Sequence, residues 1–389
     1  MNYLIIGGVA GGATVAARLR RMDEKANIIL FERGKYVSYA NCGLPYYIGD
    51  TINNREKLFV QTAKGFTDRF RIDIRTEQEV TAIRPDKKEV EIKNLSTGET
   101  YTETYDKLVL SPGAEPLRPG IEGIGSKKIF TLRNVPDTDT IKNYVNTENP
   151  KRAIVVGGGF IGLEMAENLH DLGIQVDVVE MANQVMAPLD FSMAAIVHRQ
   201  LTDKGVGLHL EDGVSRFEEK DGGVTVHLRS GKQIATDMVL LSIGVRPETK
   251  LAKDAGLAIG ERGGIAVNDY MQTSDADIYA LGDAVEVRHL VTGQPALIPL
   301  AGPANKQGRI VADNIVFGNK KKYPGSIGTS IAKVFDLTVP QPVRMQSYYN
   351  RTIYPISLPT HMGPLMPDII REPFPCPSKY CSLRKTGNC

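Results

Sequence analysis

The chain of 389 residues is long enough for two or three domains of ordinary size. Its contents of 42% hydrophobic and 24% charged residues are those of a globular protein, and four cysteines are too few for a disulfide scaffold. The net charge of +2 gives no electrostatic reason to expect a nucleic-acid or anionic-membrane partner. We find no apolar run near the roughly 18 residues of a membrane span and no secretory signal, and therefore expect a cytoplasmic protein.

The first thirty residues have the pattern of a dinucleotide-binding βαβ unit. An apolar strand at 3–6 runs into a glycine-rich turn at 7–12, an Ala-rich helix follows, and a second strand ends at Glu32. In such units the glycines permit the tight turn, the helix N-terminus faces a pyrophosphate, and the acid accepts hydrogen bonds from ribose hydroxyls. Val9 stands in place of the middle glycine, which is a departure from the pattern.

The first helix carries a polar stripe. Thr14, Arg18 and Arg21 are spaced i, i+4 and i+7, so they share one helical face. The spacing alone fits a solvated basic face as well as a phosphate-binding one.

Cys42 lies directly after this unit, in the segment 38–49, and is the only cysteine before the last fourteen residues. The position five residues on is Tyr47, so any redox cycle has to use a single thiol. A buried, inert cysteine is the ordinary alternative. An attacking thiolate needs a lowered pKa, and we expect Asn41 and the amide of Gly43 to be the nearest donors that lower it.

Two stretches rich in β-structure follow, at 78–110 and 206–243, with turns at 96–98 and 221–223. Each leads to an apolar strand that ends near a glycine, Gly113 in the first case and Gly244 in the second.

A second dinucleotide pattern lies between these stretches. A strand at 153–156 precedes Gly157, Gly159 and Gly162, a helix extends to about 172, and the next strand ends at Glu180. An acid at this point accepts from a ribose 2′-hydroxyl and repels a 2′-phosphate, and residues 181–183 supply no cation. We therefore expect NADH rather than NADPH.

A late strand at 278–281 ends in Gly282 and Asp283 and precedes an expected helix at 302–317. With the two glycine patterns and Cys42, residues 1–339 resemble the pyridine nucleotide–disulfide oxidoreductase superfamily. The segments 38–46 and 110–114 are most similar to its single-cysteine branch, the coenzyme A-disulfide reductases and NADH-dependent persulfide reductases.

The resemblance implies an α/β fold of the glutathione-reductase type, with two Rossmann-like FAD/NAD(P)-binding domains in three layers (ββα). It places an FAD-binding domain at 1–115 and 246–322, an NAD(P)H-binding domain at 116–245, and the start of a dimerisation domain at 323–339.

The resemblance also implies site residues. Cofactor binding is expected at Gly7, Gly8, Val9, Ala10, Gly11, Gly12, Glu32, Arg33, Val80, Ser111, Pro112, Gly113, Gly282, Asp283 and Ala301 for FAD, and at Gly157, Gly159, Phe160, Ile161, Gly162, Glu180 and Gly244 for NADH. The expected catalytic residues are Cys42 and Asn41, and the expected contacts of a coenzyme A substrate are Thr14, Arg18, Arg21, Ser38, Asn41 and Phe70. No metal is expected.

Three of these assignments have open alternatives. Phe160 stands where the family places an aromatic ring over the flavin, but a packing residue at a helix start fits equally. Asp283 is implied to hold the ribityl or pyrophosphate part of FAD, although Gly-Asp pairs also form simple turns. Phe70 occupies a position where some relatives carry a basic residue.

The implied function is an FAD-dependent oxidoreductase that passes electrons from NADH through flavin and Cys42 to a coenzyme A disulfide or persulfide. One alternative is an NADH oxidase or peroxidase that cycles through a sulfenic acid at Cys42. Another is a truncated, inactive remnant.

The remnant hypothesis comes from the C-terminal composition. The last 50 residues hold 9 of the 22 prolines and 3 of the 4 cysteines. A one-base shift after Val339 restores runs that resemble the family's dimerisation domain, so we interpret residues 340–389 as out of frame. Relatives form homodimers through that domain. Without it we expect an exposed apolar patch at Ile331, Val334, Phe335 and Leu337.

Overall fold

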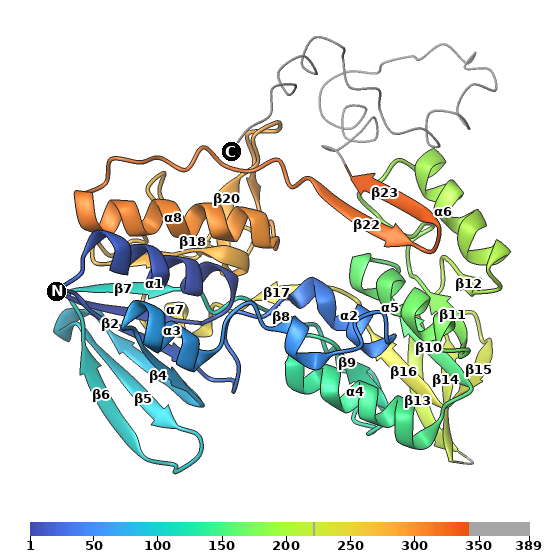
Figure 1. The fold of residues 1–389 in the computed structure, drawn as a ribbon. Coiled ribbons are helices and arrows are strands. Elements are labelled where there is room, and N and C mark those ends of the chain that lie inside the picture. Colours follow the sequence, from blue (N-terminus) through green and yellow to red (C-terminus); the bar gives the residue numbers. More distant parts are fainter. Residues whose placement is uncertain (221, 342–389) are drawn as a thin grey trace, which may run out of the picture. The chain divides into compact units, whose positions relative to one another are not determined.

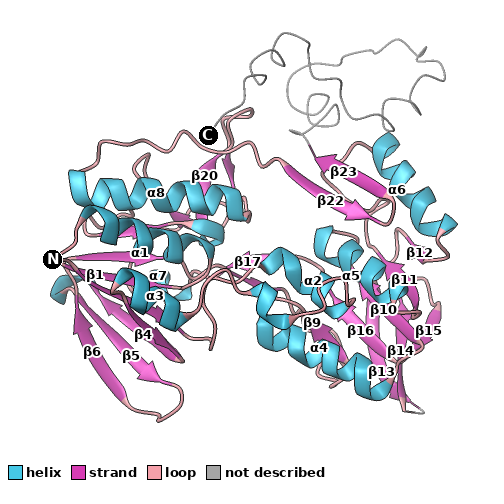
Figure 2. Ribbon diagram, viewed as in Figure 1, coloured by secondary structure: helices cyan, strands magenta, loops and turns pink. Residues whose placement is uncertain are grey.

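The computed structural model describes residues 1–220 and 222–341 (Figure 1). The first of two parallel sheets has the strand order β19-β7-β1-β2-β3. Its strands are β1 (Asn2–Ile6), β2 (Asn27–Glu32), β3 (Asp73–Thr76), β7 (Lys107–Leu110) and β19 (Ile278–Ala280). Three helices accompany it: α1 (Ala10–Met22), α3 (Ala63–Phe70) and α8 (Ala301–Phe317). Figure 2 shows α1 and α8 side by side over this sheet.

The second parallel sheet repeats the design, with the order β12-β11-β10-β16-β9. Its strands are β9 (Ile129–Thr131), β10 (Arg152–Val156), β11 (Gln175–Val179), β12 (Gly207–His209) and β16 (Met238–Leu241), and its helices are α4 (Val135–Glu148), α5 (Phe160–Asp171) and α6 (Phe191–Asp203). Strands of this kind are apolar on both faces because both faces are covered. In β10, Ala153 and Val155 pack with the helices, whereas Ile154 and Val156 pack on the other side.

The layer on that other side is an antiparallel meander. The first sheet carries β4 (Gln78–Arg84), β5 (Glu89–Asn94) and β6 (Thr100–Thr104), and the second carries β13 (Val214–Lys220), β14 (Gly223–Leu228) and β15 (Gln233–Thr236). Each meander shares a buried apolar cluster with its parallel sheet. Meander, sheet and helices are the expected three layers, so the predicted fold class is confirmed.

The chain passes from one sheet to the other through a two-stranded ribbon. Strand β8 (Ala114–Pro116) leads out of the first sheet, and β17 (Val245–Pro247) returns to it. The two strands pair antiparallel, with Val245 opposite Pro116. The ribbon therefore contains both crossings between the two sheets.

Short elements complete the described chain. They are α2 (Leu44–Ile48), α7 (Lys250–Asp254), β18 (Ile265–Ala266), β20 (Val285–Arg288), β21 (Pro295–Ala296) and 3-10 turns at Asn41–Gly43, Arg55–Leu58, Pro85–Lys87 and Gly282–Ala284. None of the described helices has the length and apolar character that crossing a membrane would require.

Helix α2 packs with the second sheet although it follows the first βαβ unit in the sequence. Leu44, Ile48 and Leu58 are buried in the cluster formed with α5 and α4 (Figure 1). The segment that begins with Cys42 is therefore anchored in the second core.

The last described element is a hairpin of β22 (Ser330–Val334) and β23 (Leu337–Gln341). The buried carboxylate of Glu167 on α5 accepts hydrogen bonds from Lys333 Nζ at 2.6 Å and from the amide of Phe335 at 2.9 Å. The expected exposed patch is therefore wrong for Val334 and Phe335, which are buried in the second core, and only Ile331 is largely exposed, at 66%.

Leu337 is partly buried against the same core. Pro340 and Gln341 continue the hairpin ladder, opposite Ile331 and Ser330. The rest of the interpreted out-of-frame tail lies outside the described residues.

The glycine turns give a first prediction. A Cβ at Gly162 would overlap the carbonyl oxygen of Gly157, whereas a Cβ at Gly159 would meet open space. We expect Gly162→Ala to lower the free energy of unfolding by about 1–3 kcal/mol, because helix α5 has to move away from β10. Gly159→Ala is the matched control. Thermal or urea unfolding of both variants checks this, and equal stabilities would contradict it.

Candidate functional site

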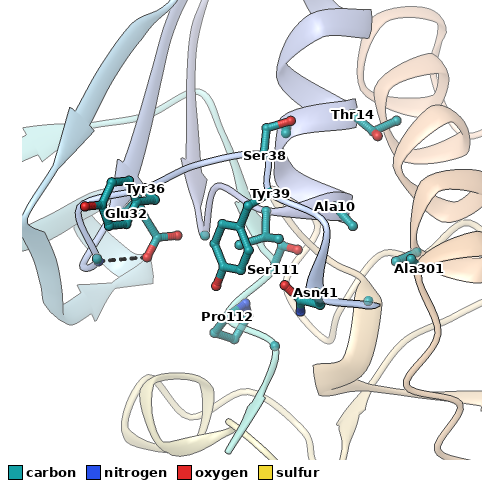
Figure 3. A pocket seen from close by; sticks show the side chains of 18 of the residues that line it. Ala10, Thr14, Glu32, Tyr36, Ser38, Tyr39, Asn41, Ser111, Pro112 and Ala301 are labelled. Carbon is teal, nitrogen blue, oxygen red and sulfur yellow. Dashed lines mark hydrogen bonds between the residues drawn. The ribbon is translucent and has the colours of Figure 1, made fainter. Parts of the chain in front are cut away.

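A cavity of about 970 Å³ opens at the carboxyl ends of β1, β2 and β7. Of the predicted FAD, catalytic and substrate residues, all but Gly8 and Gly12 line it. Figure 3 shows Ser38, Tyr39 and Asn41 on one segment of the wall and Ser111 and Pro112 on another. The fold therefore brings together predicted site residues from five separate parts of the chain.

The first glycine turn is built as predicted. Gly7 has a φ of +97°, and a Cβ there would overlap the carbonyl oxygen of Ser111. Glu32 accepts hydrogen bonds from the amides of Gly8 and Gly34, both at 2.8 Å, so its carboxylate is fixed at the cavity wall (Figure 3). Gly12 lies behind the wall, where a Cβ would overlap the carbonyl oxygen of Gly7.

Asp283 is the strongest sign of a polar ligand in this cavity. It is partly buried on the wall, and no described residue donates a hydrogen bond to it. Burial raises the pKa of its carboxyl to about 6, against a smaller opposing effect of Arg133. A buried carboxyl that accepts no hydrogen bond from the protein can accept one from a hydroxyl group of a bound polyol chain. The residues present therefore fit FAD.

Arg33 does not present a free charge to the cavity. Its guanidinium makes a two-pronged ion pair with Glu248, at 2.9 and 2.8 Å. Arg133 joins the same carboxylate at 3.1 Å. These pairs connect the end of β2 to residues on either side of the β8–β17 ribbon.

Cys42 is a free, exposed thiol on the cavity wall, in the 3-10 turn that precedes α2. It is therefore not the buried, inert cysteine that was the ordinary alternative. The surrounding protein raises the pKa of the thiol, first through desolvation and then through the negative charge of Glu164, while the backbone amide of Cys42 itself opposes the shift.

The expectation that Asn41 and the Gly43 amide lower this pKa is therefore wrong for the described chain. Desolvation of the thiol and the negative charge of Glu164 on α5 raise the pKa by more than the backbone amide of Cys42 lowers it.

Glu164 was missed from the sequence. It lies on α5, four residues after Phe160, and its pKa is raised to about 7 by burial and by the charge of Glu167, against a hydrogen bond from Tyr46. Burial, and after it the charge of the same carboxylate, raises the pKa of Tyr46 to about 12. The acids at positions 164 and 167 are spaced i, i+3 and so share one face of α5, which is the signal that the sequence offered.

The substrate stripe is divided by the structure. Thr14 donates to the side chain of Asn305 at 2.7 Å. Arg18 makes a two-pronged ion pair with Asp313 on α8, at 2.5 and 2.9 Å, and is thereby occupied. Arg21 has its guanidinium 5.5 Å from the centre of the Phe70 ring. All three residues line the cavity, and their contact with a substrate stays a prediction.

Other cavity residues were not predicted. Tyr39, Arg69, Asn305 and Arg309 also line the wall. The two arginines belong to no motif that the sequence analysis could single out, since Arg69 lies in the last turn of α3 and Arg309 in the middle of α8.

The second glycine turn matches its prediction in geometry. Gly157 has a φ of +108° and Gly244 one of +110°. Glu180 accepts from the amides of Gly158 and Ala182 at 2.7 and 2.8 Å, as Glu32 does in the first unit. Ile161 is exposed at the start of α5.

Phe160 packs beside the second core cluster and does not line the described cavity. Of the two alternatives for Phe160, this packing favours the packing residue at a helix start.

Comparisons with known proteins agree with this geometry. Residues 1–308 match the family model described as pyridine nucleotide-disulphide oxidoreductase. A coenzyme A disulfide reductase of Staphylococcus aureus (strain JH9) is 34% identical over 337 residues, which are 87% of this chain and 75% of the relative.

Two solved structures are similar to most of the chain. Reduced Bacillus anthracis CoADR-RHD has a TM-score of 0.88 at 54% identity, covering 90% of this chain and 63% of that one. An NAD-dependent persulfide reductase from A. fulgidus has a TM-score of 0.87 at 39% identity, covering 90% and 65%. This chain thus spans less than two thirds of each of these two chains.

The two dinucleotide units, joined by one ribbon, define a two-domain FAD/NAD(P)-binding oxidoreductase. The chain belongs to the pyridine nucleotide-disulphide oxidoreductase family.

The charge of Glu164 gives a second prediction. Because its carboxylate raises the pKa of Cys42, we expect Glu164→Gln to lower that pKa and to speed alkylation of the thiol near neutral pH. The measurement is the rate of Cys42 labelling by iodoacetamide against pH, followed on the Cys42 peptide by mass spectrometry.

Asp171→Asn removes a carboxylate from the same helix and serves as the control. Unchanged labelling in Glu164→Gln, or an equal change in the control, would contradict the assignment.

Proposed function

We propose that this protein is an FAD-dependent reductase that uses NADH to reduce a coenzyme A disulfide or persulfide through Cys42. The observation that carries the proposal is the exposed thiol of Cys42, the one cysteine among the described residues, on the wall of the cavity that the first dinucleotide unit forms. The names of the relatives, a coenzyme A disulfide reductase and a persulfide reductase, support the same substrate class.

The reaction balances with one protein thiol. The Cys42 thiolate attacks one sulfur of the substrate disulfide, the sulfur–sulfur bond breaks, and the first thiol leaves with a proton. A mixed disulfide then joins Cys42 to the second substrate half. Two electrons and a proton release that half and restore the thiolate.

The cofactor residues have separate tasks in this proposal. Bound FAD would relay to the sulfur pair the two electrons that NADH supplies. The cavity residues of the first unit would hold FAD, with Glu32 at the ribose and Asp283 at a polyol or pyrophosphate segment. The second unit would hold NADH, with Glu180 at its adenosine ribose.

Residues near the thiol would control its proton. Glu164 has a pKa near neutrality and lies close enough to Cys42 to influence its titration. Its protonated form removes the charge that disfavours the thiolate. Asn41, beside Cys42 on the cavity wall, would orient the substrate sulfur.

We further propose the domain limits expected from the sequence, with residues 323–339 beginning a dimerisation domain. The hairpin β22–β23 supports this, because it packs on α5 and α6 and extends from the second core.

The thiol mechanism predicts that Cys42→Ser abolishes turnover of coenzyme A disulfide while FAD remains bound, because no other described residue is a cysteine. Steady-state oxidation of NADH, together with the flavin absorbance of the purified variant, checks both parts. Undiminished disulfide turnover would refute the single-thiol mechanism. Turnover by wild type with oxygen alone would favour the oxidase alternative.

The choice of nicotinamide nucleotide is a separate prediction. The carboxylate of Glu180 is fixed by two amides, so a 2′-phosphate would meet an unneutralised negative charge. We expect kcat/KM for flavin reduction to be higher with NADH than with NADPH. In Glu180→Gln, the ratio of the NADH value to the NADPH value should be smaller than in wild type. Equal values for the two nucleotides in wild type would rule out this role of Glu180.

A further inference from the structure

The loop at residues 181–190 joins β11 to α6 and returns to the glycine turn of the second dinucleotide unit. Its first part is fixed by Glu180, which accepts a hydrogen bond from the amide of Ala182 at 2.8 Å. Further along the loop, the amide of Met186 donates to the carbonyl oxygen of Gly158 at 2.8 Å. The amide of Gly158 donates in turn to Glu180 at 2.7 Å. The loop, the turn and the acid therefore form one closed set of hydrogen bonds.

The middle of this loop lies directly against the glycine turn. Val185 is fully buried, and a Cβ on Gly158 would lie 2.7 Å from its Cγ1. Met186 has a φ of +51°, in the left-handed region that residues other than glycine seldom adopt. A conformation of this kind persists only where the surrounding contacts hold it. The shape of the turn therefore depends on what holds residues 185 and 186.

A histidine on α6 holds this part of the loop. Nε2 of His198 accepts a hydrogen bond from the amide of Val185 at 3.1 Å. The imidazole is half-buried and forms a T-shaped contact with the Phe191 ring, with ring centres 6.2 Å apart. A ring nitrogen that carries a proton cannot accept from an amide, so this contact requires the neutral imidazole.

The charges around His198 leave its imidazole neutral at neutral pH. Burial lowers its pKa, and among the described residues no charged group contributes to that shift. Residues 181–189 carry no charged side chain. The charged groups on the neighbouring elements are Arg199 paired with Asp203, Lys204 paired with Asp336 of the hairpin, His209 paired with Asp177, Asp190 before α6, and Glu180. The Val185 contact is therefore present at neutral pH and is lost as the pH falls through the lowered pKa of His198.

We infer that His198 is a positioning residue for the nicotinamide nucleotide, because it holds residues 185 and 186 against the glycine turn that would receive the pyrophosphate. It acts through Val185 and Gly158 and not on the reacting atoms. This inference rests on the proposed function, since it assumes that the second unit binds NADH. Its consequence is that nucleotide affinity depends on the protonation of a side chain outside the glycine turn.

The first test compares two substitutions of nearly equal size. His198→Gln keeps an uncharged acceptor close to the position of Nε2, whereas His198→Met has none. ADP-ribose, the part of NADH without its nicotinamide, is titrated by calorimetry into the flavin-loaded protein at about pH 8, where histidine is neutral. We expect about fivefold weaker binding in His198→Met, the loss of one hydrogen bond, and close to wild-type affinity in His198→Gln.

The second test repeats these titrations down to about pH 5, across the range in which histidine gains its proton. The affinity of wild type should fall until it is as low as that of His198→Met or lower, because the protonated imidazole cannot accept from Val185. Both His198 variants should lack this part of the pH dependence. His227→Gln is the matched control, since His227 belongs to the same unit but lies on β14 and pairs with Glu218 at 2.8 Å. It should keep the wild-type profile.

Three results would overturn the inference: equal affinities of wild type and His198→Met at about pH 8, the wild-type pH profile in His198→Gln, or loss of that profile in His227→Gln. If His198→Met does not fold, the profile of His198→Gln decides alone. A wild type that reduces no disulfide, while its binding of ADP-ribose still depends on His198, would refute the proposed function and leave the inference standing. Normal disulfide turnover, with binding of ADP-ribose that does not depend on His198, would do the reverse.

Discussion

The placement of the reactive thiol depends on one constraint, which is that its segment is fastened to two different cores. On the N-terminal side, the amide of Ser38 donates to the carbonyl oxygen of Gly8 at 2.9 Å, within the first glycine turn. On the C-terminal side, Leu44 and Ile48 are buried against the helices of the second sheet. Cys42 lies between these anchors, so its position is determined by both dinucleotide units together.

The same arrangement explains the electrostatics of the thiol. Helix α2 packs against α5, and this contact brings the acidic face of α5 toward Cys42. Glu167 is occupied by the hairpin, through Lys333 and the Phe335 amide. Glu164 accepts a hydrogen bond from Tyr46, but burial and then the charge of Glu167 raise the pKa of its carboxyl. The raised pKa of the carboxyl beside the nucleophile is thus a consequence of packing.

Local patterns allowed much of the fold and site to be predicted. Gly7, Gly157, Glu32 and Glu180 lie where their spacing indicated, because a tight turn after a parallel strand admits only one arrangement of amides around the acid.

What the sequence could not indicate came from contacts between distant segments. The partner of Arg18 is on α8, the carboxylate that faces Cys42 is on α5, and Val334 and Phe335 are buried by a helix that precedes them by more than a hundred residues. In each case a partner distant in the sequence decides the environment of the side chain, and local patterns carry no information about that partner.

The β8–β17 ribbon has a consequence for how such a chain is assembled. Its two strands are the entry and exit of the whole second unit, and Pro116 and Val245 lie directly opposite each other. Strands β7 and β19 of the first sheet are therefore neighbours despite the long stretch of chain between them. The ribbon holds the two ends of the inserted unit next to each other, so for the first sheet the unit is equivalent to a short loop. It therefore adds little to the entropy cost of closing the chain between β7 and β19. A unit bounded in this way can be exchanged for another nucleotide-binding module without changing the strand order of its host.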